Sequence, residues 1–507
     1  MNNRGTMTKP TDPHVRSAKG ECPSHWRVLQ PLFCLCTLLF LAAGCAVGPN
    51  YRRPAVDSPA TFRGEPTATT NSFADLAWWD VYQDATLQAL IREALTNNYD
   101  LRIAVTRVEQ ARAVAMQARS QFVPSINYNG TVSRGRNELL GNVIPNGGAT
   151  GSAVAGTLNA FWEVDLWGRV RRLNESARAQ FLATEEGRRG VLLSLLSDVS
   201  TVYLRLLELD QELEVASRTT NSFGDSLKIF SQRLEGGVAS ELETDRAEAA
   251  LANAAAALPD IQQQIVLTEN QLCILLGRPP SPIERSDSLL RQRMPPEVSA
   301  GLPSALLERR PDVRQAEQLM RSANADVGEA VAEFFPQIGL TAFLGKVSSE
   351  LSAITLGSAN AWSAAASVSG PLFQGGRLTG QYRQRKAARE EARLRYQYAV
   401  LTAFQDVANA LISREKRAEI REQQAREVKA LDAAVHVSTK RYLAGKASYY
   451  EVLEAQQQLF PAELNLARVE RDQLLAIVQL YKALGGGWDM DQSSRATAVI
   501  SPPDAKR

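Results

Sequence analysis

The first half of the chain carries a long, regular series of apolar residues. They recur at alternating steps of three and four, with one polar member: Leu192, Leu195, Val199, Val202, Leu206, Leu209, Leu213, Ala216, Thr220, Phe223, Leu227, Phe230 and Leu234. This spacing is typical of a coiled-coil seam. A helix from Val170 to Leu234 would be about 100 Å long. The Gly236-Gly237 pair interrupts it, and we expect a returning helix over residues 240–276.

A second helical hairpin is expected in the other half of the chain. Its first helix would cover residues 378–443 and its return residues 446–484. The apolar seam is less regular here, because Arg414 and Arg421 fall on it.

Apolar and polar residues alternate with period two ahead of each long helix. In the first half the apolar positions are Ile126, Tyr128, Gly130, Val132, Leu158, Ala160, Trp162, Val164 and Leu166, on either side of a Gly/Asn-rich loop at 141–151. In the second half they are Ile338, Leu340, Ala342, Leu344, Trp362, Ala364, Ala366 and Val368. Phe161 is the apolar exception on the polar side. This pattern predicts four strands, each with one apolar and one polar face.

The two halves are copies of one unit. Asp100 corresponds to Asp312 and Pro124 to Pro336, each pair separated by 212 positions. Later matches are separated by 208: Gly168-Arg169 with Gly376-Arg377, Arg233 to Ser240 with Arg441 to Ser448, and Leu276-Gly277 with Leu484-Gly485. We therefore expect a duplicated helix-strand-strand-helix-helix unit at 77–277 and 302–488, joined by a Pro-rich linker at 278–301 and followed by a polar tail at 489–507.

The N-terminus predicts export. A basic stretch precedes twelve nearly all apolar residues, Leu32 to Ala43. Twelve helical residues span about 18 Å, short of the roughly 30 Å hydrocarbon core, so residues 1–44 are interpreted as a signal peptide. The small residues before Cys45 resemble a bacterial lipobox. The resemblance implies acylation of Cys45, a lipid-anchored segment at 45–76 and, because Ala46 follows, sorting to the outer membrane.

Composition limits the chemistry. The 507 residues are 44% hydrophobic and 22% charged, with a net charge of +2. After signal removal only His436 and one free thiol, Cys273, remain. This argues against a multi-histidine metal site, a Ser-His-Asp triad and a disulfide. With no phosphate-binding loop either, we expect no enzyme activity and no cofactor.

Four amphipathic strands cannot close a membrane barrel, for which about eight are the minimum. A spanning sheet has no open edge, because lipid cannot satisfy its backbone groups. The chain should therefore oligomerise. The alternative interpretation is a soluble β-sandwich edge, although one hairpin between such long helices would be unusual in a sandwich.

A family resemblance rests on these residues together. The segment Ala46 to Pro54, Trp78-Trp79, the repeated Phe-Pro elements and the closing Leu484 to Trp488 resemble the OprM/NodT-type efflux lipoproteins of the TolC superfamily. The resemblance implies a homotrimer with a twelve-stranded outer-membrane barrel, four strands per chain, and a periplasmic α-helical coiled-coil tunnel. It implies a passive exit duct for drugs or other small toxic compounds. Its partners would be a periplasmic adaptor (membrane fusion) protein and an inner-membrane RND-type transporter.

The two glycine-containing turns are the candidate working sites. The resemblance implies that such turns form the periplasmic tips where the adaptor docks, carried here by Arg233, Gly237, Ser240, Arg441, Gly445 and Ser448. Ordinary turn chemistry accounts for the same residues, since glycine takes positive φ and serine caps a helix. Charges near the second turn are candidates for a periplasmic gate: Lys446, Glu451 and Glu454.

Three competing interpretations remain at this point. A periplasmic coiled-coil scaffold would explain the heptads but not the two-faced strands. A lipid-anchored enzyme would be left with carboxylate chemistry alone, and no acid pair stands out. Among channels, the alternative is a type I protein-secretion duct, against which the lipobox argues by resemblance.

Overall fold

The computed structural model describes residues 46–64, 72–136, 150–238, 240–285, 288–292, 299–301 and 303–486. The predicted signal peptide, Cys45 and the polar tail lie outside these ranges. The described residues divide into two compact units. A sheet unit contains residues 126–169 and 335–370, and a helical unit contains most of the rest. Each unit is described separately.

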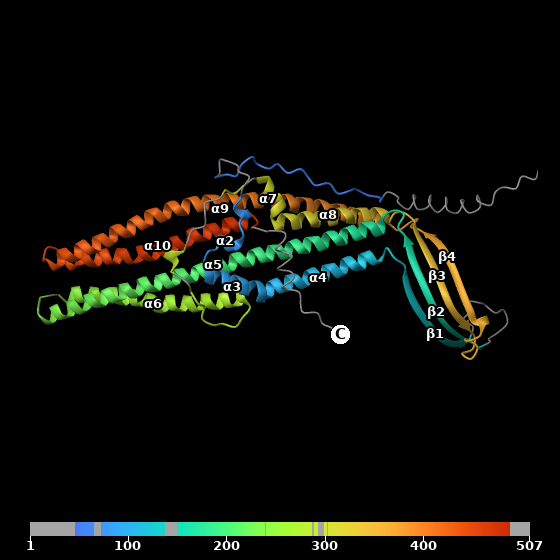
Figure 1. Ribbon diagram of the computed structural model, residues 1–507, viewed down its shortest axis with the longest axis horizontal. Coiled ribbons are helices and arrows are strands. Elements are labelled where there is room, and N and C mark those ends of the chain that lie inside the picture. The colour runs from blue at the N-terminus through green and yellow to red at the C-terminus, as the bar shows by residue number, and fades with distance from the viewer. Residues whose placement is uncertain are drawn as a thin grey trace, which may run out of the picture. The chain divides into compact units, whose positions relative to one another are not determined.

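The sheet unit is a four-stranded sheet in the order β1-β2-β3-β4 (Figure 1). The strands are β1 (Ser125–Arg136), β2 (Thr150–Val164), β3 (Gln337–Ser348) and β4 (Asn360–Ser369), with the short helix η3 (Gly357–Ala359) before β4. β2 pairs with β3 and β3 with β4, both antiparallel. β2 begins at Thr150, so the loop predicted at 141–151 overlaps the first two residues of this strand. β1 and β4 are the outer strands.

The register places the predicted apolar residues on one face. Leu158 lies opposite Leu344, which lies opposite Trp362. Directly paired residues share a face of the sheet, so these side chains form a ladder across three strands. Their exposed fractions are 52%, 62% and 77%. The predicted alternation is confirmed in β2, β3 and β4, and no described residue covers this ladder.

The helical unit is built from two long hairpins, two helices of intermediate length and several short helices (Figure 1). The main helices are α4 (Tyr99–Ser120), α5 (Arg169–Glu235), α6 (Glu241–Leu276), α8 (Pro311–Ala332), α9 (Arg377–Leu443) and α10 (Tyr449–Ala483). Shorter elements are η1 (Phe73–Asp75), α2 (Trp78–Val81), α3 (Ala85–Asn97), η2 (Leu289–Arg291) and α7 (Pro303–Arg309). α4 and α8 both have 22 residues, and α5 and α9 both have 67.

The α5 seam is buried largely as its spacing predicts. Val199, Leu206, Leu209 and Ala216 are fully buried, whereas Leu234, at the end of the series, is partly exposed. One apolar stretch of α5 is long enough to cross a membrane, but 67% of it is buried inside the chain. Packing within the helical unit therefore accounts for its hydropathy.

The irregular α9 seam has a different explanation. Arg421, which interrupts it, pairs with the buried Glu470 of α10 at 3.2 Å. Earlier in the helix, Tyr396, Val400 and Val407 are fully buried in the main core. An arginine on the seam is thus accommodated by a carboxylate from the returning helix.

α5 and α8 pack against each other in antiparallel fashion. The Ser176 and Ser322 hydroxyls are 2.9 Å apart. Farther along α5, Glu186 pairs with Arg314 at 2.8 Å. Residue numbers rise along α5 as they fall along α8, so the two helices are antiparallel. The contact joins a helix of the first half of the chain to a helix of the second half.

Residues 48–53 cross this helix pair without forming helix or strand. Gly48 touches Gly328, and a Cβ at Gly48 would lie 2.5 Å from the Gly328 Cα, so no side chain fits there. Arg172 of α5 covers Gly328 and donates to the Gly48 carbonyl at 3.4 Å. Arg53 pairs with Glu317 at 3.1 Å. This segment therefore contacts both α5 and α8 and helps to hold the two helices together.

Candidate functional site

The first tip is the turn between α5 and α6. The Val238 N–H donates to the Arg233 carbonyl at 2.9 Å, and Gly237 has φ +69°. This is the left-handed C-terminal turn that glycine favours. Ser240 is the N-cap of α6, and its N–H donates to the Glu243 carboxylate at 3.0 Å. The turn chemistry expected from the sequence is present.

The second tip repeats this geometry between α9 and α10. The Lys446 N–H donates to the Arg441 carbonyl at 2.9 Å, and Gly445 again has φ +69°. Ser448 is the N-cap of α10. Equivalent residues therefore reverse the chain in both hairpins.

The two tips touch through Arg233 and Tyr442. The Arg233 guanidinium donates to the Tyr442 hydroxyl and also lies over its ring, 5.4 Å from the centroid. A second pair, Arg246 over Tyr450 at 5.5 Å, joins α6 to α10. Cation–π contacts at exposed sites contribute about 0.5–1 kcal/mol each. The link between the two tips is therefore weak.

An aromatic cluster lies directly behind this link. The Phe230 and Tyr449 rings are 3.9 Å apart, and Tyr442 lies about 6 Å from both. Phe230 and Tyr449 are buried with Val452 and Leu453. Burial raises the pKa of Tyr449, so its hydroxyl stays neutral at physiological pH. This small core holds the first hairpin to the second.

A groove of about 350 Å³ opens beside the cluster, between α5, α9 and α10. Its polar lining includes Asp225, Asp432 and the exposed His436. No group of three or more His, Cys, Asp or Glu side chains suited to a metal ion occurs among the described residues. His436 is solvated, as its surface position on a helix suggests.

The three gate candidates differ in their surroundings. Glu451 pairs with Arg441 at 3.0 Å, and both side chains are about half exposed, so this ion pair contributes little stability. Lys446 and Glu454 are exposed. Within the described part of the chain, no hydrogen bond or ion pair is found for the Glu454 side chain.

Farther from the tips, a buried ion cluster joins α5 to α10. Glu208 is fully buried and accepts from Arg205 and from Arg471, the latter at 2.7 Å. Arg468 pairs with the neighbouring Glu212 at 2.8 Å. Burial raises the pKa of Glu208, while Arg471 opposes the shift.

Sequence reasoning missed Tyr442 and the ion cluster. Tyr442 directly follows Arg441, and only the three-dimensional fold brings it to Arg233. Glu208 and Arg471 lie in opposite halves of the chain, and each resembles an ordinary helix-surface charge. Heptad position was the available signal, since Glu208 lies between the seam residues Leu206 and Leu209.

Comparison with known proteins gives a consistent result. The family model described as outer membrane efflux protein matches residues 90–278 and 302–486. The solvent efflux pump outer membrane protein SrpC of Pseudomonas putida is 33% identical over 465 residues, covering 90% of this chain and 98% of SrpC. The outer-membrane channel OprN superimposes with a TM-score of 0.80 at 30% identity, covering 88% of this chain and all of OprN. The open MtrE channel of Neisseria gonorrhoeae also gives 0.80 at 30% identity, covering 87% and 98%.

Proposed function

This chain belongs to the outer membrane efflux protein family and is an outer-membrane channel subunit of an efflux system, and on that basis we propose that three copies assemble into one duct. Each copy would supply four strands to a twelve-stranded barrel and its long hairpins to a periplasmic tunnel. The duct would be passive. Energy would come from an inner-membrane transporter of the RND type, reached through a periplasmic adaptor.

The observation that carries this proposal is the uncovered apolar face of a sheet that has two outer strands. Leu344, Trp362 and Val368 are 62%, 77% and 71% exposed. In water such a ladder would be an aggregation hazard, whereas in lipid it is the expected outer surface. The outer strands β1 and β4 have different sequences, so head-to-tail pairing between copies would close the sheet into a ring.

The tips would form the adaptor-docking end. We propose that Arg233, Gly237 and Ser240, with Arg441, Gly445 and Ser448, present the docking turns. The closed state would be held by the Arg233–Tyr442 link, and Lys446, Glu451 and Glu454 would line the constriction. The MtrE channel has been solved in an open state, which supports a family duct that opens.

The exported compounds would be small and toxic. SrpC is named for solvent efflux, which supports hydrophobic small molecules as the substrate class. We also propose acylation of Cys45 after removal of residues 1–44, a lipid-anchored segment at 45–76, and two copies of one unit at 77–277 and 302–488, flanked by the linker at 278–301 and the tail at 489–507. Support for the duplication comes from the equal lengths of α4 and α8 and of α5 and α9.

Single-channel conductance in planar bilayers tests the duct, combined with the native mass of the same preparation. We expect a mass of three acylated chains and discrete openings of uniform size. Chain mass under denaturing conditions reports the acyl groups separately. A monomer that never conducts would contradict the proposal and favour the periplasmic scaffold.

A further inference from the structure

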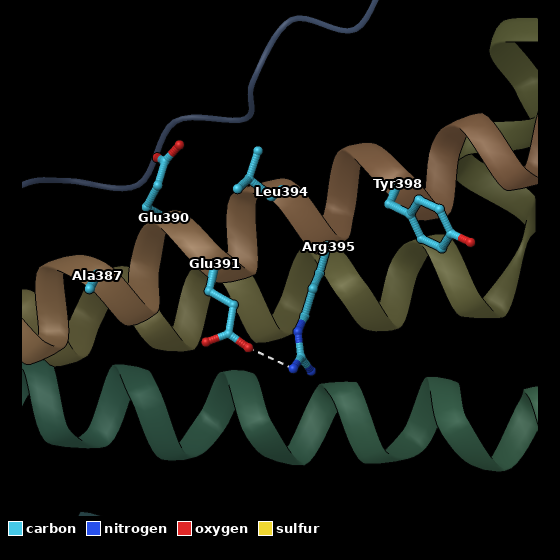
Figure 2. Close-up of a pocket in the computed structure, with 6 residues that line it drawn as sticks. All are labelled: Ala387, Glu390, Glu391, Leu394, Arg395 and Tyr398. Atoms are coloured by element: carbon cyan, nitrogen blue, oxygen red, sulfur yellow. Dashed lines mark ion pairs between the residues drawn. The ribbon is translucent and has the colours of Figure 1, made fainter.

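Two of the hollows along α9 differ in how they are built. Figure 2 shows one of them, between Ala387 and Tyr398, where every lining residue belongs to α9 and Glu391 pairs with Arg395 of the same helix. That hollow is the open face of a single helix. The other is the groove of about 350 Å³ beside the aromatic cluster, and its walls come from α5, α9 and α10. A ligand in this groove would contact both hairpins.

One wall of the groove is aromatic. Phe230, Tyr442 and Tyr449 all line it, with the Phe230 and Tyr449 rings 3.9 Å apart and Tyr442 about 6 Å from each. The faces of such rings attract cations, and clustered rings recognise organic ammonium groups. Tyr442 already holds one cation, the Arg233 guanidinium, 5.4 Å from its ring centroid. The wall therefore favours a positively charged ligand.

The charged groups of the groove have the complementary sign. Asp225 lies on α5 and Asp432 on α9, so each hairpin contributes one carboxylate. Both residues are exposed, and within the described part of the chain neither carboxylate has an ion pair or a hydrogen bond. No lysine or arginine is found among the described residues that line the groove. Two carboxylates are therefore available to a cation from outside.

Two buried polar atoms in the lining lack partners among the described residues. Tyr449 is 4% exposed, and no hydrogen bond is formed by its hydroxyl. The neighbouring Ser226 hydroxyl donates instead to the Ser222 carbonyl at 3.0 Å. The Gln456 Oε1 atom is also buried and unpaired, although its Nε2 donates to the Ser222 hydroxyl at 3.1 Å. Unpaired buried polar groups are costly, so both atoms favour a ligand that carries hydrogen-bond donors.

We propose that this groove binds a small organic cation, a protonated primary amine on an apolar body. The ammonium group would lie between the two carboxylates and donate to the unpaired oxygen atoms. The apolar body would lie on the aromatic wall and against Ile229 and Val435, which also line the groove. A volume of about 350 Å³ is at the lower end of the range for ligand pockets, about 300–1,000 Å³, so the ligand is small.

The site has a consequence for the tips, and this consequence rests on the proposed duct. A ligand that contacts α5 together with α9 and α10 binds best when the two hairpins are joined. Binding to one of two states shifts the equilibrium toward that state. The amine would therefore favour the closed tip and oppose opening.

Calorimetric titration of the full-length protein in a non-ionic detergent tests the site. The probes are phenethylamine and its neutral counterpart, 2-phenylethanol. We expect the amine to bind about tenfold more tightly than the alcohol, because only the amine is charged at neutral pH. Asp432→Asn should weaken amine binding about fivefold, as for a partly exposed ion pair, and leave alcohol binding unchanged. Asp245→Asn, at an exposed position of α6 outside the groove, is the matched control and should bind the amine like the wild type.

Tyr449→Phe gives a readout that a structural role would not produce. The substitution keeps the ring and removes a buried hydroxyl without a partner, so the Tm of the unliganded protein should not fall. Amine binding should weaken about tenfold, because a hydrogen bond to a charged group is lost. Equal affinities for amine and alcohol, or the same loss in Asp245→Asn as in Asp432→Asn, would overturn the site.

Conductance separates the site from the duct. At ten times its Kd, the amine should raise the closed-to-open ratio of the wild type about elevenfold for each occupied groove. The same concentration should raise it about threefold in Asp432→Asn, whose affinity is fivefold lower. Equal effects in the two proteins would contradict control of the tip from this groove. A protein that binds the amine as expected but never conducts would reject the duct and support the binding site.

Discussion

Arg233 and Arg441 occupy equivalent positions in the two tips but have different partners. Arg441 pairs with Glu451 within its own hairpin, whereas Arg233 reaches across to Tyr442 of the other hairpin. Arg441 therefore stabilises its own turn, whereas Arg233 links the two tips to each other. Only the second contact has to break if the hairpins separate at the tips.

Replacement of Arg233 by alanine should favour the open duct. The substitution removes a cation–π contact and a hydrogen bond at an exposed site, together about 1 kcal/mol. That would shift the closed-to-open ratio about fivefold for each link. Single-channel recordings would report it as a higher open probability. Lys228→Ala is the matched control, because it removes one exposed positive charge from the same helix. Equal open probabilities in the two variants would show that the link does not hold the tip closed.

The ion cluster between α5 and α10 acts at the scale of whole helices. Glu208 and Glu212 of one hairpin are held by Arg471 and Arg468 of the other. Burying charge is costly, so a buried ion cluster adds little net stability, whereas removing one partner leaves an uncompensated buried charge and is strongly destabilising. The cluster joins α5 to α10 at a point away from the tips.

Glu208→Gln should change how stability depends on pH. Because the pKa of Glu208 is raised by burial, the folded protein holds this proton more tightly than the unfolded chain does. The contribution of Glu208 to stability is therefore fully present below the unfolded pKa of about 4.3, and it is lost as pH rises through the higher folded value. Calorimetry should show that the Tm of the wild type falls with rising pH relative to the Gln variant. Glu214→Gln, at an exposed position of α5, should track the wild type throughout, and a parallel response of both variants would contradict the assignment.

At the scale of elements, the helices and strands could be predicted from regular patterns of apolar residues. The heptad series runs through the C-terminal two thirds of α5, and the expected helix, Val170 to Leu234, matches α5 to within one residue at either end. Period-two alternation identified the face of β3 that carries Leu340 and Leu344. Glycines predicted the turns at both tips, where Gly237 and Gly445 have positive φ. What the sequence could not provide were contacts between residues of unrelated local pattern. Examples are Arg233 with Tyr442 and Arg421 with Glu470, where the fold, and not the spacing, supplies the partner.

At the scale of the whole molecule, each of the two units has surfaces that are free to bind another copy. The sheet ends in β1 and β4, and the helical unit leaves faces of α4 and α9 exposed. In each unit the two free surfaces differ from each other. One surface of a copy can therefore bind the other surface of an identical copy. If three copies assemble as proposed, the duct would carry three copies of every charge at its tip.

Substitution of Glu454 should report the electrostatics of that tip. Glu451 is partly neutralised by Arg441, whereas Glu454 is exposed, so three Glu454 carboxylates near the axis would favour cations. We expect Glu454→Gln to lower the cation preference, measured as a smaller reversal potential across a KCl gradient. The effect should be largest near 0.1 M salt and fade by 1 M, because the screening length falls from about 10 Å to about 3 Å. Glu248→Gln, an exposed carboxylate of α6, controls for the change in overall charge. An unchanged reversal potential in the Glu454 variant would place its carboxylate away from the conduction path and leave Lys446 and Glu451 as the candidates for the constriction.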